Sequence, residues 1–263
     1  MVDIVILTKS KLSYLFNCLE SIKKTTYDTK YHIYIGDTGS TSEELQRISK
    51  FVRDTFPDKN VSLIKFDYYN FAANNNYIVE NYCTNKYVLF CNNDIKIIDE
   101  CIDKMVKYAE DNDNIGTIGC KLIFGDQTIQ HAGQCLFLNQ DGGNLWVSHR
   151  GLRENNSMYN NIEPVAGNTG GFMLTLRDNF TKYKFNERYI ECLEDLEYNL
   201  SLIGEGKENI YMGNVSAYHY ENVTRGRNEQ SDERFRVDYA NTFLPFIKNH
   251  KNKNKILKYA LVI

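Results

Sequence analysis

The sequence predicts an α/β protein built around a mostly parallel sheet. Three features support this prediction: short apolar runs, stretches between them with apolar residues at helical spacing, and polar residues where the runs end. Strands that alternate with helices form parallel sheets through right-handed crossovers. The carboxyl ends of such strands meet at one edge of the sheet, and ligands bind there.

The alternation is clearest in residues 1–95. Strands are predicted at 2–8, 31–35, 61–66 and 87–91. Helices are predicted between these strands, at 12–22, after a capping box formed by Thr41 and Glu44, and at 72–82. The polar ends of the first, second and fourth strands are therefore expected at the same edge.

The fourth apolar run stops abruptly on the short polar side chains of Asn92, Asn93 and Asp94. At a strand end, this set places one carboxylate beside two amides, which can hold a divalent cation and the polar rim of a nucleotide. The alternative is an Asn-rich turn that caps a following helix, because Asn and Asp favour turns and helix N-termini. The residues alone leave both interpretations open.

The rest of the chain is less regular, and no internal repeat or linker divides it, so a single domain over 1–263 is predicted. The later elements are a helix over 102–109, a smaller β region at 115–150, a strand at 170–176, a pair of short strands at 208–219, a helix at 235–249 and a solvated tail at 250–255. Gly170 and Gly171 let a ligand approach the backbone closely. A simple bulge explains one of these glycines equally well.

Composition argues against several classes of protein. The 263 residues carry a formal net charge of −3, and no basic block is long enough to indicate nucleic-acid binding. The seven Cys are odd in number and none is spaced as CxxC, which predicts buried thiols in a reducing compartment. With no signal segment or membrane span in view, a cytoplasmic protein is expected, and peripheral membrane contact stays open.

An acidic run contains the candidate catalytic base. Glu191, Glu194 and Asp195 share one helical face if a helix begins at Glu191. Clustered carboxylates raise one another's pKa, which suits a general base. The alternative is a set of charges that favour a helix N-terminus, and this explains Glu197 best.

Six motifs in order over residues 2–220 resemble those of the inverting family 2 glycosyltransferases. They are Asp37-Thr38-Gly39-Ser40, Asn70-Phe71-Ala72-Ala73-Asn74-Asn75, Asn92-Asn93-Asp94, Gln130-His131-Ala132-Gly133, Phe185-Asn186-Glu187 with Glu194-Asp195, and His219. The fourth resembles a stretch of a rhamnosyltransferase-like branch. The resemblance implies the GT-A fold, a single Rossmann-like α/β/α domain. Asn92 departs from the family's D-x-D signature, and this removes one negative charge beside a metal ion.

The resemblance also implies roles for individual residues. Asp195 is the expected base with Glu194 as its rival, and Mn²⁺ or Mg²⁺ is expected on Asp94 and His219. Nucleotide-sugar binding is implied for Thr8, Asp37, Ser40, Asn70, Asn75, Asn92 and Asn93, and acceptor binding for Gly170, Gly171 and His131. The alternative for His219 is a core histidine bonded to a backbone carbonyl. Arg225 and Arg227 are either a clamp for the diphosphate or solvated surface charges.

The function implied is inverting, metal-dependent sugar transfer from a UDP- or dTDP-linked donor to a saccharide or glycoconjugate. Residues 1–95 form the expected nucleotide-binding half, 96–220 the acceptor and catalytic half, and 221–263 a C-terminal loop, helix and tail. A sugar-nucleotide pyrophosphorylase is one alternative, but no glycine-rich phosphate loop is present. A relative that binds without turnover is another, supported only by Asn92. The C-terminal part could close over the donor, form a homodimer or touch a membrane.

Overall fold

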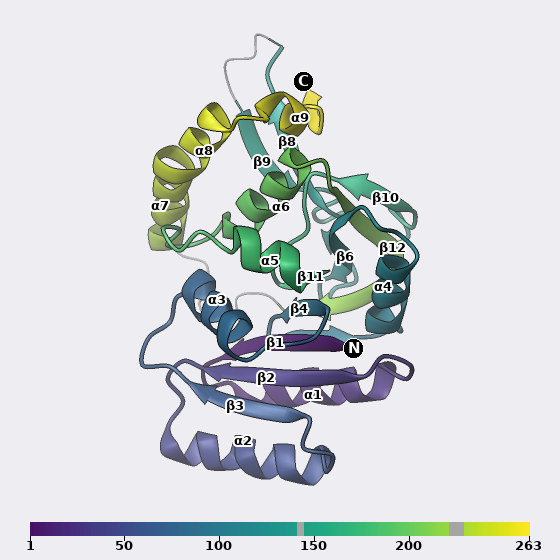
Figure 1. Cartoon of the computed structure of the whole chain (residues 1–263), viewed down its shortest axis with the longest axis vertical. Coiled ribbons are helices and arrows are strands. Elements are labelled where there is room, and N and C mark those ends of the chain that lie inside the picture. The colour runs from purple at the N-terminus through teal and green to yellow at the C-terminus, as the bar shows by residue number, and fades with distance from the viewer. Residues whose placement is uncertain (141–144, 221–228) are drawn as a thin grey trace.

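A computed structural model describes residues 1–140, 145–220 and 229–263. One large mixed sheet runs through the protein with helices on both faces, and a smaller sheet lies above it in the view of Figure 1. The strand order of the large sheet is β10-β12-β6-β11-β4-β1-β2-β3, with β5 paired to β12 and β7 paired to β6. The smaller sheet has the order β13-β8-β9. The predicted α/β class is confirmed.

The first half follows the predicted alternation closely. Its elements are β1 (Val2–Thr8), α1 (Leu12–Thr25), β2 (Tyr31–Asp37), α2 (Ser42–Thr55), β3 (Val61–Lys65), α3 (Phe71–Asn81) and β4 (Tyr87–Cys91). Strands β1 to β4 pair with one another in parallel, and Thr8 pairs with Asp37 in the register of β1 and β2. The capping box of Thr41 and Glu44 is present at the start of α2. The polar strand ends therefore share one edge, as predicted.

The second half departs from prediction at three points. Its elements are β5 (Ile95–Ile97), α4 (Cys101–Glu110), β6 (Ile115–Ile123), β7 (Ile129–His131), β8 (Gln134–Leu138), β9 (Leu145–His149), β10 (Ile162–Val165), β11 (Phe172–Leu176), α5 (Arg177–Tyr183), α6 (Glu194–Gly204) and β12 (Glu208–His219). A short strand that was not predicted, β5, lies between Asp94 and α4, while the helix predicted over 102–109 is present as α4. The expected pair of strands at 208–219 is one strand, β12, whose register against β6 shifts twice and so interrupts its pattern. Helix α6 begins at Glu194, so Glu191 lies outside it and the expected shared face is wrong.

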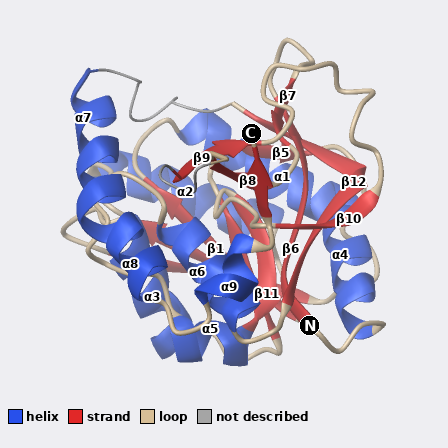
Figure 2. Ribbon diagram, turned by 90° about the horizontal axis from the view of Figure 1, so that it is seen from above, coloured by secondary structure: helices blue, strands red, loops and turns tan. Residues whose placement is uncertain are grey.

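The C-terminal part is more helical than predicted. It contains α7 (Glu229–Asp238), a π-helical turn (Tyr239–Phe243), α8 (Leu244–Asn249), α9 (Lys253–Leu257) and β13 (Ala260–Val262). Residues 250–255, expected to be a solvated tail, instead lead into α9. There Asn252 Nδ2 donates to the carbonyl of Gly204 at 2.8 Å, which satisfies one of the free carbonyls at the end of α6. Figure 2 shows α7 and α8 in line along one side of the molecule.

Apolar side chains form the core on both faces of the large sheet. One cluster packs α1, α2 and α4 against one face, and a second packs α3, α5 and α6 against the other. A third cluster joins α6, α8 and α9 to the smaller sheet. Helix α6 therefore contacts both sheets, and it carries the predicted base at its first turn.

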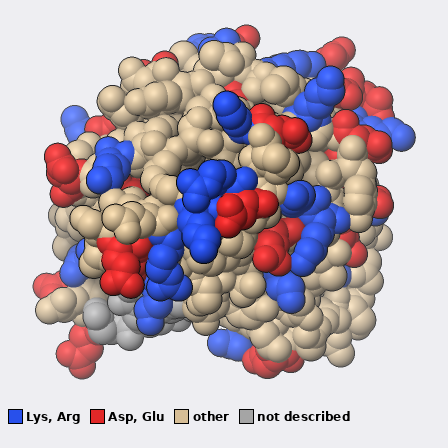
Figure 3. Space-filling model, turned by 90° about the horizontal axis from the view of Figure 1, so that it is seen from below, with Lys and Arg blue, Asp and Glu red and all other residues tan. Residues whose placement is uncertain are grey.

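The surface on the α2 side of the molecule carries both acidic and basic side chains. In Figure 3 the Lys, Arg, Asp and Glu side chains are interspersed over this face, with no field of one sign. Among the helices in the described part of the chain, none is long and apolar enough to cross a membrane.

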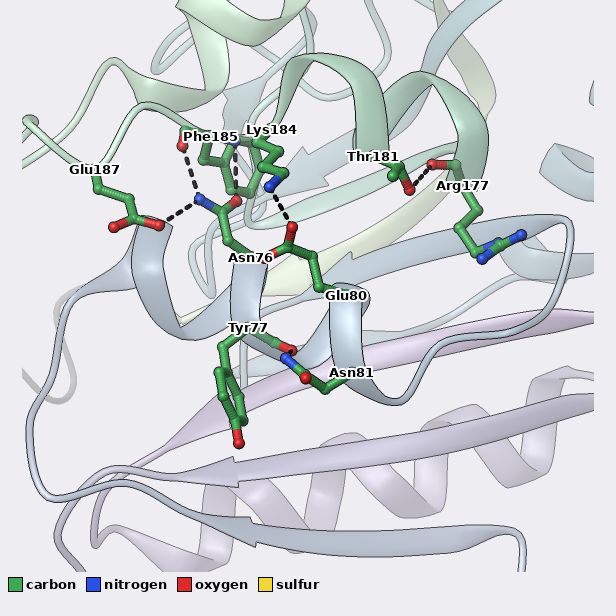
Figure 4. A network of polar contacts seen from close by, with 9 residues as sticks. All are labelled: Asn76, Tyr77, Glu80, Asn81, Arg177, Thr181, Lys184, Phe185 and Glu187. Atoms are coloured by element: carbon green, nitrogen blue, oxygen red, sulfur yellow. Dashed lines mark hydrogen bonds and ion pairs between the residues drawn. The ribbon is translucent and has the colours of Figure 1, made fainter.

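The buried Asn76 ties helix α3 to the segment that enters α6. Its amide nitrogen donates to the carbonyl of Phe185 and to the Glu187 carboxylate, both at 2.9 Å, and its amide oxygen accepts from the Phe185 N–H at 3.0 Å (Figure 4). Lys184 and Glu80 form an ion pair beside it. One side chain thus satisfies both the N–H and the carbonyl of a single buried residue, Phe185.

Replacement of Asn76 by Ala is therefore expected to lower the free energy of unfolding by about 1–3 kcal/mol, because it leaves the buried Phe185 N–H and carbonyl without partners. Urea denaturation followed by circular dichroism measures this. Asn81 is a matched control on the same helix, since its exposed amide donates only to Tyr77 O of its own helix. Its replacement by Ala should change stability by less than about 0.5 kcal/mol. Equal effects at both positions would contradict the prediction.

Candidate active site

The ends of β1, β2 and β4 form the first part of the site. Asn93 Nδ2 donates to Thr8 Oγ1 at 3.0 Å, so the polar ends of β4 and β1 are joined by a side-chain bond. Asp37 is buried at the end of β2, where its carboxylate accepts the Ser40 N–H at 3.2 Å. Ser40 Oγ in turn accepts the Ser10 N–H at 3.2 Å. These predicted nucleotide-binding residues lie together at one sheet edge.

Asn70 and Asn75 have structural partners in helix α3. Asn70 caps the helix, and its Oδ1 accepts the Ala73 N–H at 2.8 Å. Asn75 is buried and donates to the carbonyl of Phe71 at 2.8 Å. Both residues therefore help to form the helix beneath the site, and direct contact with a nucleotide stays a prediction for them.

Asp94 and His219 meet although 125 residues separate them in the sequence, because β12 pairs with β5 directly after Asp94. Asp94 Oδ1 lies 3.2 Å from His219 Nε2, and Asn92 Nδ2 lies 3.3 Å from the same nitrogen. On the other side of the ring, His219 Nδ1 lies 2.8 Å from Gln130 Oε1. The partners of His219 are thus side chains, and not the backbone carbonyl of the core-histidine alternative.

This arrangement fits a divalent cation. An amide oxygen only accepts, so Gln130 Oε1 requires a proton on His219 Nδ1, and in the neutral ring the lone pair then lies on Nε2. That lone pair and the Asp94 carboxylate face each other across 3.2 Å, which is favourable when a proton or a cation lies between them. Mg²⁺ and Mn²⁺ sites often use one or two protein ligands together with substrate phosphates. No group of three or more His, Cys, Asp or Glu side chains within residues 1–140, 145–220 and 229–263 could hold a metal ion.

Asp195 lies in the first turn of α6, where three donors hold its carboxylate. Oδ2 accepts the Gly170 N–H at 2.8 Å, and Oδ1 accepts from Gln134 Nε2 at 3.2 Å and from the Leu196 N–H at 2.6 Å. Glu194 is buried one position earlier. The Asp195 carboxylate is thus bound directly to the loop before β11.

That loop, residues 169–171, separates the two groups of side chains. A Cβ atom at Gly171 would lie 3.3 Å from Asn92 Nδ2 and 3.4 Å from His219 Cε1, while one at Gly170 would lie 3.4 Å from Asp195 Cβ. The backbone of this loop therefore lies between the Asp94 and His219 pair and Asp195. Acceptor binding by these glycines stays a prediction.

His131 lies beneath the same loop. Its Nε2 accepts the Thr169 N–H at 3.4 Å, and its Nδ1 lies 3.1 Å from Nδ1 of His149. Burial, together with the charges of His149 and His219, lowers the pKa of His131 well below its ordinary value. The ring is therefore neutral at physiological pH and supports the loop backbone.

The C-terminal helices reach the site through Asp238. This buried carboxylate at the end of α7 accepts the N–H groups of Ile190, Glu191 and Cys192, the closest at 2.7 Å from Glu191 N. It therefore fixes the segment that leads into α6. Arg225 and Arg227, the candidate diphosphate clamp, lie outside the described residues.

Glu197 lies in the first turn of α6, as expected for an acidic residue that favours a helix N-terminus. Its carboxylate also accepts from the Tyr189 hydroxyl at 2.6 Å and from Asn186 Nδ2 at 2.9 Å, and burial raises its pKa. It therefore links α6 to the preceding segment as well.

Several residues of the site were not predicted from the sequence. Asn199 Oδ1 accepts from Thr117 Oγ1 at 2.6 Å and from the Asn168 N–H at 3.1 Å, and its Nδ2 donates to the Asp195 carbonyl at 2.7 Å. Gln134 was also missed. No local pattern marks these side chains, because Thr117 and Asn168 are distant from Asn199 in the chain and Asp195 is distant from Gln134.

Comparison with known proteins now decides the family. The sequence model of Glycosyl transferase family 2 matches residues 3–183, more than half of the chain. The chain belongs to this family. It is also 23% identical over 246 residues to the O-antigen biosynthesis protein RfbC of Myxococcus xanthus, and 26% identical over 251 residues to the uncharacterized protein y4gI of Sinorhizobium fredii. Each match covers 91% of the chain, but only 19% and 27% of those relatives.

Solved structures identify the fold as GT-A. Staphylococcus aureus TarS residues 1–349 match with a TM-score of 0.68 at 14% identity, covering 97% of this chain and 69% of that one. GalNAc-T7 with UDP, GalNAc and Mn²⁺ matches with a TM-score of 0.68 at 13% identity, covering 98% and 55%. The mannosyltransferase PcManGT of Pyrobaculum calidifontis, in complex with GDP-Man and Mn²⁺, matches with a TM-score of 0.63 at 14% identity, covering 94% and 63%.

Proposed function

We propose that the chain is an inverting, divalent-metal-dependent glycosyltransferase. Its donor is a UDP- or dTDP-linked sugar, and its acceptor is a hydroxyl of a saccharide or glycoconjugate. One observation carries the proposal: the Asp94 and His219 pair and the Asp195 carboxylate lie on either side of the loop 169–171. We call the side of the loop with Asp94 and His219 the metal pole, where the leaving group would depart, and the side with Asp195 the base pole.

The metal pole suits a diphosphate leaving group. When bound, Mn²⁺ or Mg²⁺ supplies the positive charge that neutralises the departing diphosphate. Asp94 offers it a carboxylate oxygen and His219 a nitrogen, and the nitrogen suits Mn²⁺ better than Mg²⁺. Thr8 and Asp37, at the same sheet edge, are positioned to bind the nucleoside.

Asp195 is the proposed general base. It takes the proton of the acceptor hydroxyl as that oxygen forms a bond to the anomeric carbon. The bond from this carbon to the diphosphate breaks on the opposite face, so the configuration inverts. The Gly170 N–H and the Gln134 amide hold the carboxylate in place during attack.

The known relatives support this reading. One carries O-antigen biosynthesis in its name, and two structural neighbours were solved with Mn²⁺ and either UDP or GDP-Man. The Gln-His-Ala-Gly stretch favours a dTDP-linked deoxyhexose, whereas the two structural neighbours were solved with UDP and with GDP-Man. Donors with thymidine, uridine and guanosine are therefore all tested. We assign the nucleotide to residues 1–95, and the acceptor and base to residues 96–220, with residues 229–263 supporting the second half.

A thermal-shift panel tests the proposal. UDP, dTDP, GDP and their sugars are each added with and without Mn²⁺. A ligand that binds only the native state at about 100 times its Kd should raise the melting temperature by about 5–10 °C. A Mn²⁺-dependent shift with one nucleotide identifies the base of the donor. Well-folded protein that shifts with none of them would overturn the proposed transferase activity.

A further inference from the structure

The short segment 130–134 reaches both poles of the site. It starts in β7 and ends at the first residue of β8, passing through Gly133 at a φ of 96°. A Cβ atom at Gly133 would lie 2.6 Å from Val165 Cγ1, so the turn packs tightly against β10. Three buried side chains leave this segment in three directions: Gln130, His131 and Gln134.

Gln130 acts on the metal pole. Its Oε1 accepts from His219 Nδ1 at 2.8 Å, and both side chains are more than nine-tenths buried. Because the amide oxygen cannot donate, it selects the ring tautomer with an unprotonated Nε2. Asn92 Nδ2 is 3.3 Å from that nitrogen and can donate to it, which is consistent with the same tautomer.

Gln134 acts on the base pole. Its Nε2 donates to Asp195 Oδ1 at 3.2 Å, and its backbone N–H donates to the Gly167 carbonyl at 2.7 Å. Gly167 lies so close that a Cβ atom there would be 2.4 Å from Gln134 Oε1. Gln134 Oε1 is buried without a hydrogen-bond partner, so the bond from Nε2 to the Asp195 carboxylate is what orients the amide.

His131 completes the arrangement between the two glutamines. Its Nε2 accepts the N–H of Thr169, the first residue of the loop that separates the poles. The segment 130–134 is therefore bound to the metal pole, to the loop and to the base pole through three buried side chains.

We propose that residues 130–134 are a positioning segment for both poles. Gln130 fixes the metal-binding tautomer and ring orientation of His219, and Gln134 orients the Asp195 carboxylate. The inference rests on the proposed function for its metal ion and its base. Neither glutamine touches a reacting atom, and each acts through the residue it holds.

The test uses Gln130→Met and Gln134→Met, which keep the size of each side chain and remove its amide. Mn²⁺ affinity is measured from the loss of the electron paramagnetic resonance signal of free Mn²⁺. The protein is kept saturated with UDP, or with dTDP or GDP if the thermal-shift panel selects one of them. Gln130→Met should weaken Mn²⁺ about 10–100-fold, as loss of a partner behind a metal ligand does. Gln134→Met should leave this affinity within about twofold, since it lies at the other pole.

Gln134→Met is instead expected to lower kcat for hydrolysis of the donor sugar nucleotide about 10-fold, with KM for the donor unchanged. Gln130→Glu keeps an acceptor for His219 Nδ1 and should bind Mn²⁺ within about threefold of the unaltered chain. If Gln130→Glu keeps its Mn²⁺ affinity, the loss in Gln130→Met comes from the orientation of His219. Thermal unfolding of all variants shows separately whether any of them is destabilised.

The outcomes divide cleanly. Equal Mn²⁺ affinity of the unaltered chain and Gln130→Met would overturn this inference and leave the proposed function standing. An equal loss in Gln130→Glu and Gln130→Met would also overturn it, because the acceptor would then be irrelevant. An unaltered chain that binds nucleotide but no Mn²⁺ would overturn the proposed metal dependence, and this inference with it.

Discussion

Replacement of Asp195 by Asn is expected to lower kcat for sugar transfer or donor hydrolysis about 10²–10⁴-fold, the usual contribution of a general base. The Asn amide keeps the size of the side chain, and its oxygen can still accept the Gly170 N–H that now binds Oδ2. The loss comes from the missing negative charge together with the bonds that Oδ1 accepts from Gln134 and Leu196, because an amide NH₂ group cannot accept them. Activity is measured as release of the nucleoside diphosphate at saturating donor.

Binding of the donor should survive this change. Asp195 lies across the loop 169–171 from the Asp94 and His219 pair. The Mn²⁺-dependent thermal shift of Asp195→Asn should therefore match that of the unaltered chain. Glu194→Gln is the matched control, because it removes the neighbouring carboxylate. If Glu194→Gln lost more activity than Asp195→Asn, the base would have to be reassigned to Glu194.

The parallel half of the fold could be predicted because its signals are local. Each strand between Val2 and Cys91 is an apolar run of five to seven residues, and each ends at polar groups that face the same edge. The capping box at Thr41 depends on a side chain only three residues away. Apolar periodicity and helix capping depend on residues only a few positions apart, so both can be recognised without knowledge of the rest of the chain.

The errors arise where distant contacts override local pattern. Strand β12 is one element because β6 and β10 flank it, although two register shifts break its alternation. The start of α6 depends on Asp238, which binds the backbone of residues 190–192 from a helix near the end of the chain. Nothing near Glu191 in the sequence indicates that contact.

The candidate site divides in the same way. Asp94 could be predicted from its position at the end of an apolar run, whereas His219 depended on resemblance to a family. Its partner Gln130 lies in the Gln-His-Ala-Gly motif, but no role was predicted for it, and no sequence pattern indicates Gln134. Both glutamines act through buried hydrogen bonds to residues at least 60 positions away. Such partners become visible only when the fold brings them together.

Replacement of Asp94 by Ala is expected to abolish Mn²⁺-dependent binding of the nucleotide. Asp94 is the carboxylate that faces His219 Nε2, and Asn92 stands where the family has a second one. Loss of a partner behind a metal ligand already costs about 10–100-fold in affinity, so loss of this ligand should cost more than about 100-fold. The thermal shift with Mn²⁺ and nucleotide should disappear, while protein without ligands still melts cooperatively. An unchanged shift would show that the ion binds elsewhere.

The opposite change at Asn92 should strengthen the same site. Asn92→Asp adds a second carboxylate within reach of His219 Nε2, which Asn92 Nδ2 approaches to 3.3 Å. Without a cation, two carboxylates and a ring lone pair repel one another, so stability should fall slightly. With Mn²⁺ bound, the added charge should tighten binding about 10-fold, because the number of charged ligands tunes affinity for hard cations. A melting temperature that falls without Mn²⁺ and rises with it would locate the ion between β4 and β12, whereas the same response with and without Mn²⁺ would place it outside this pair of strands.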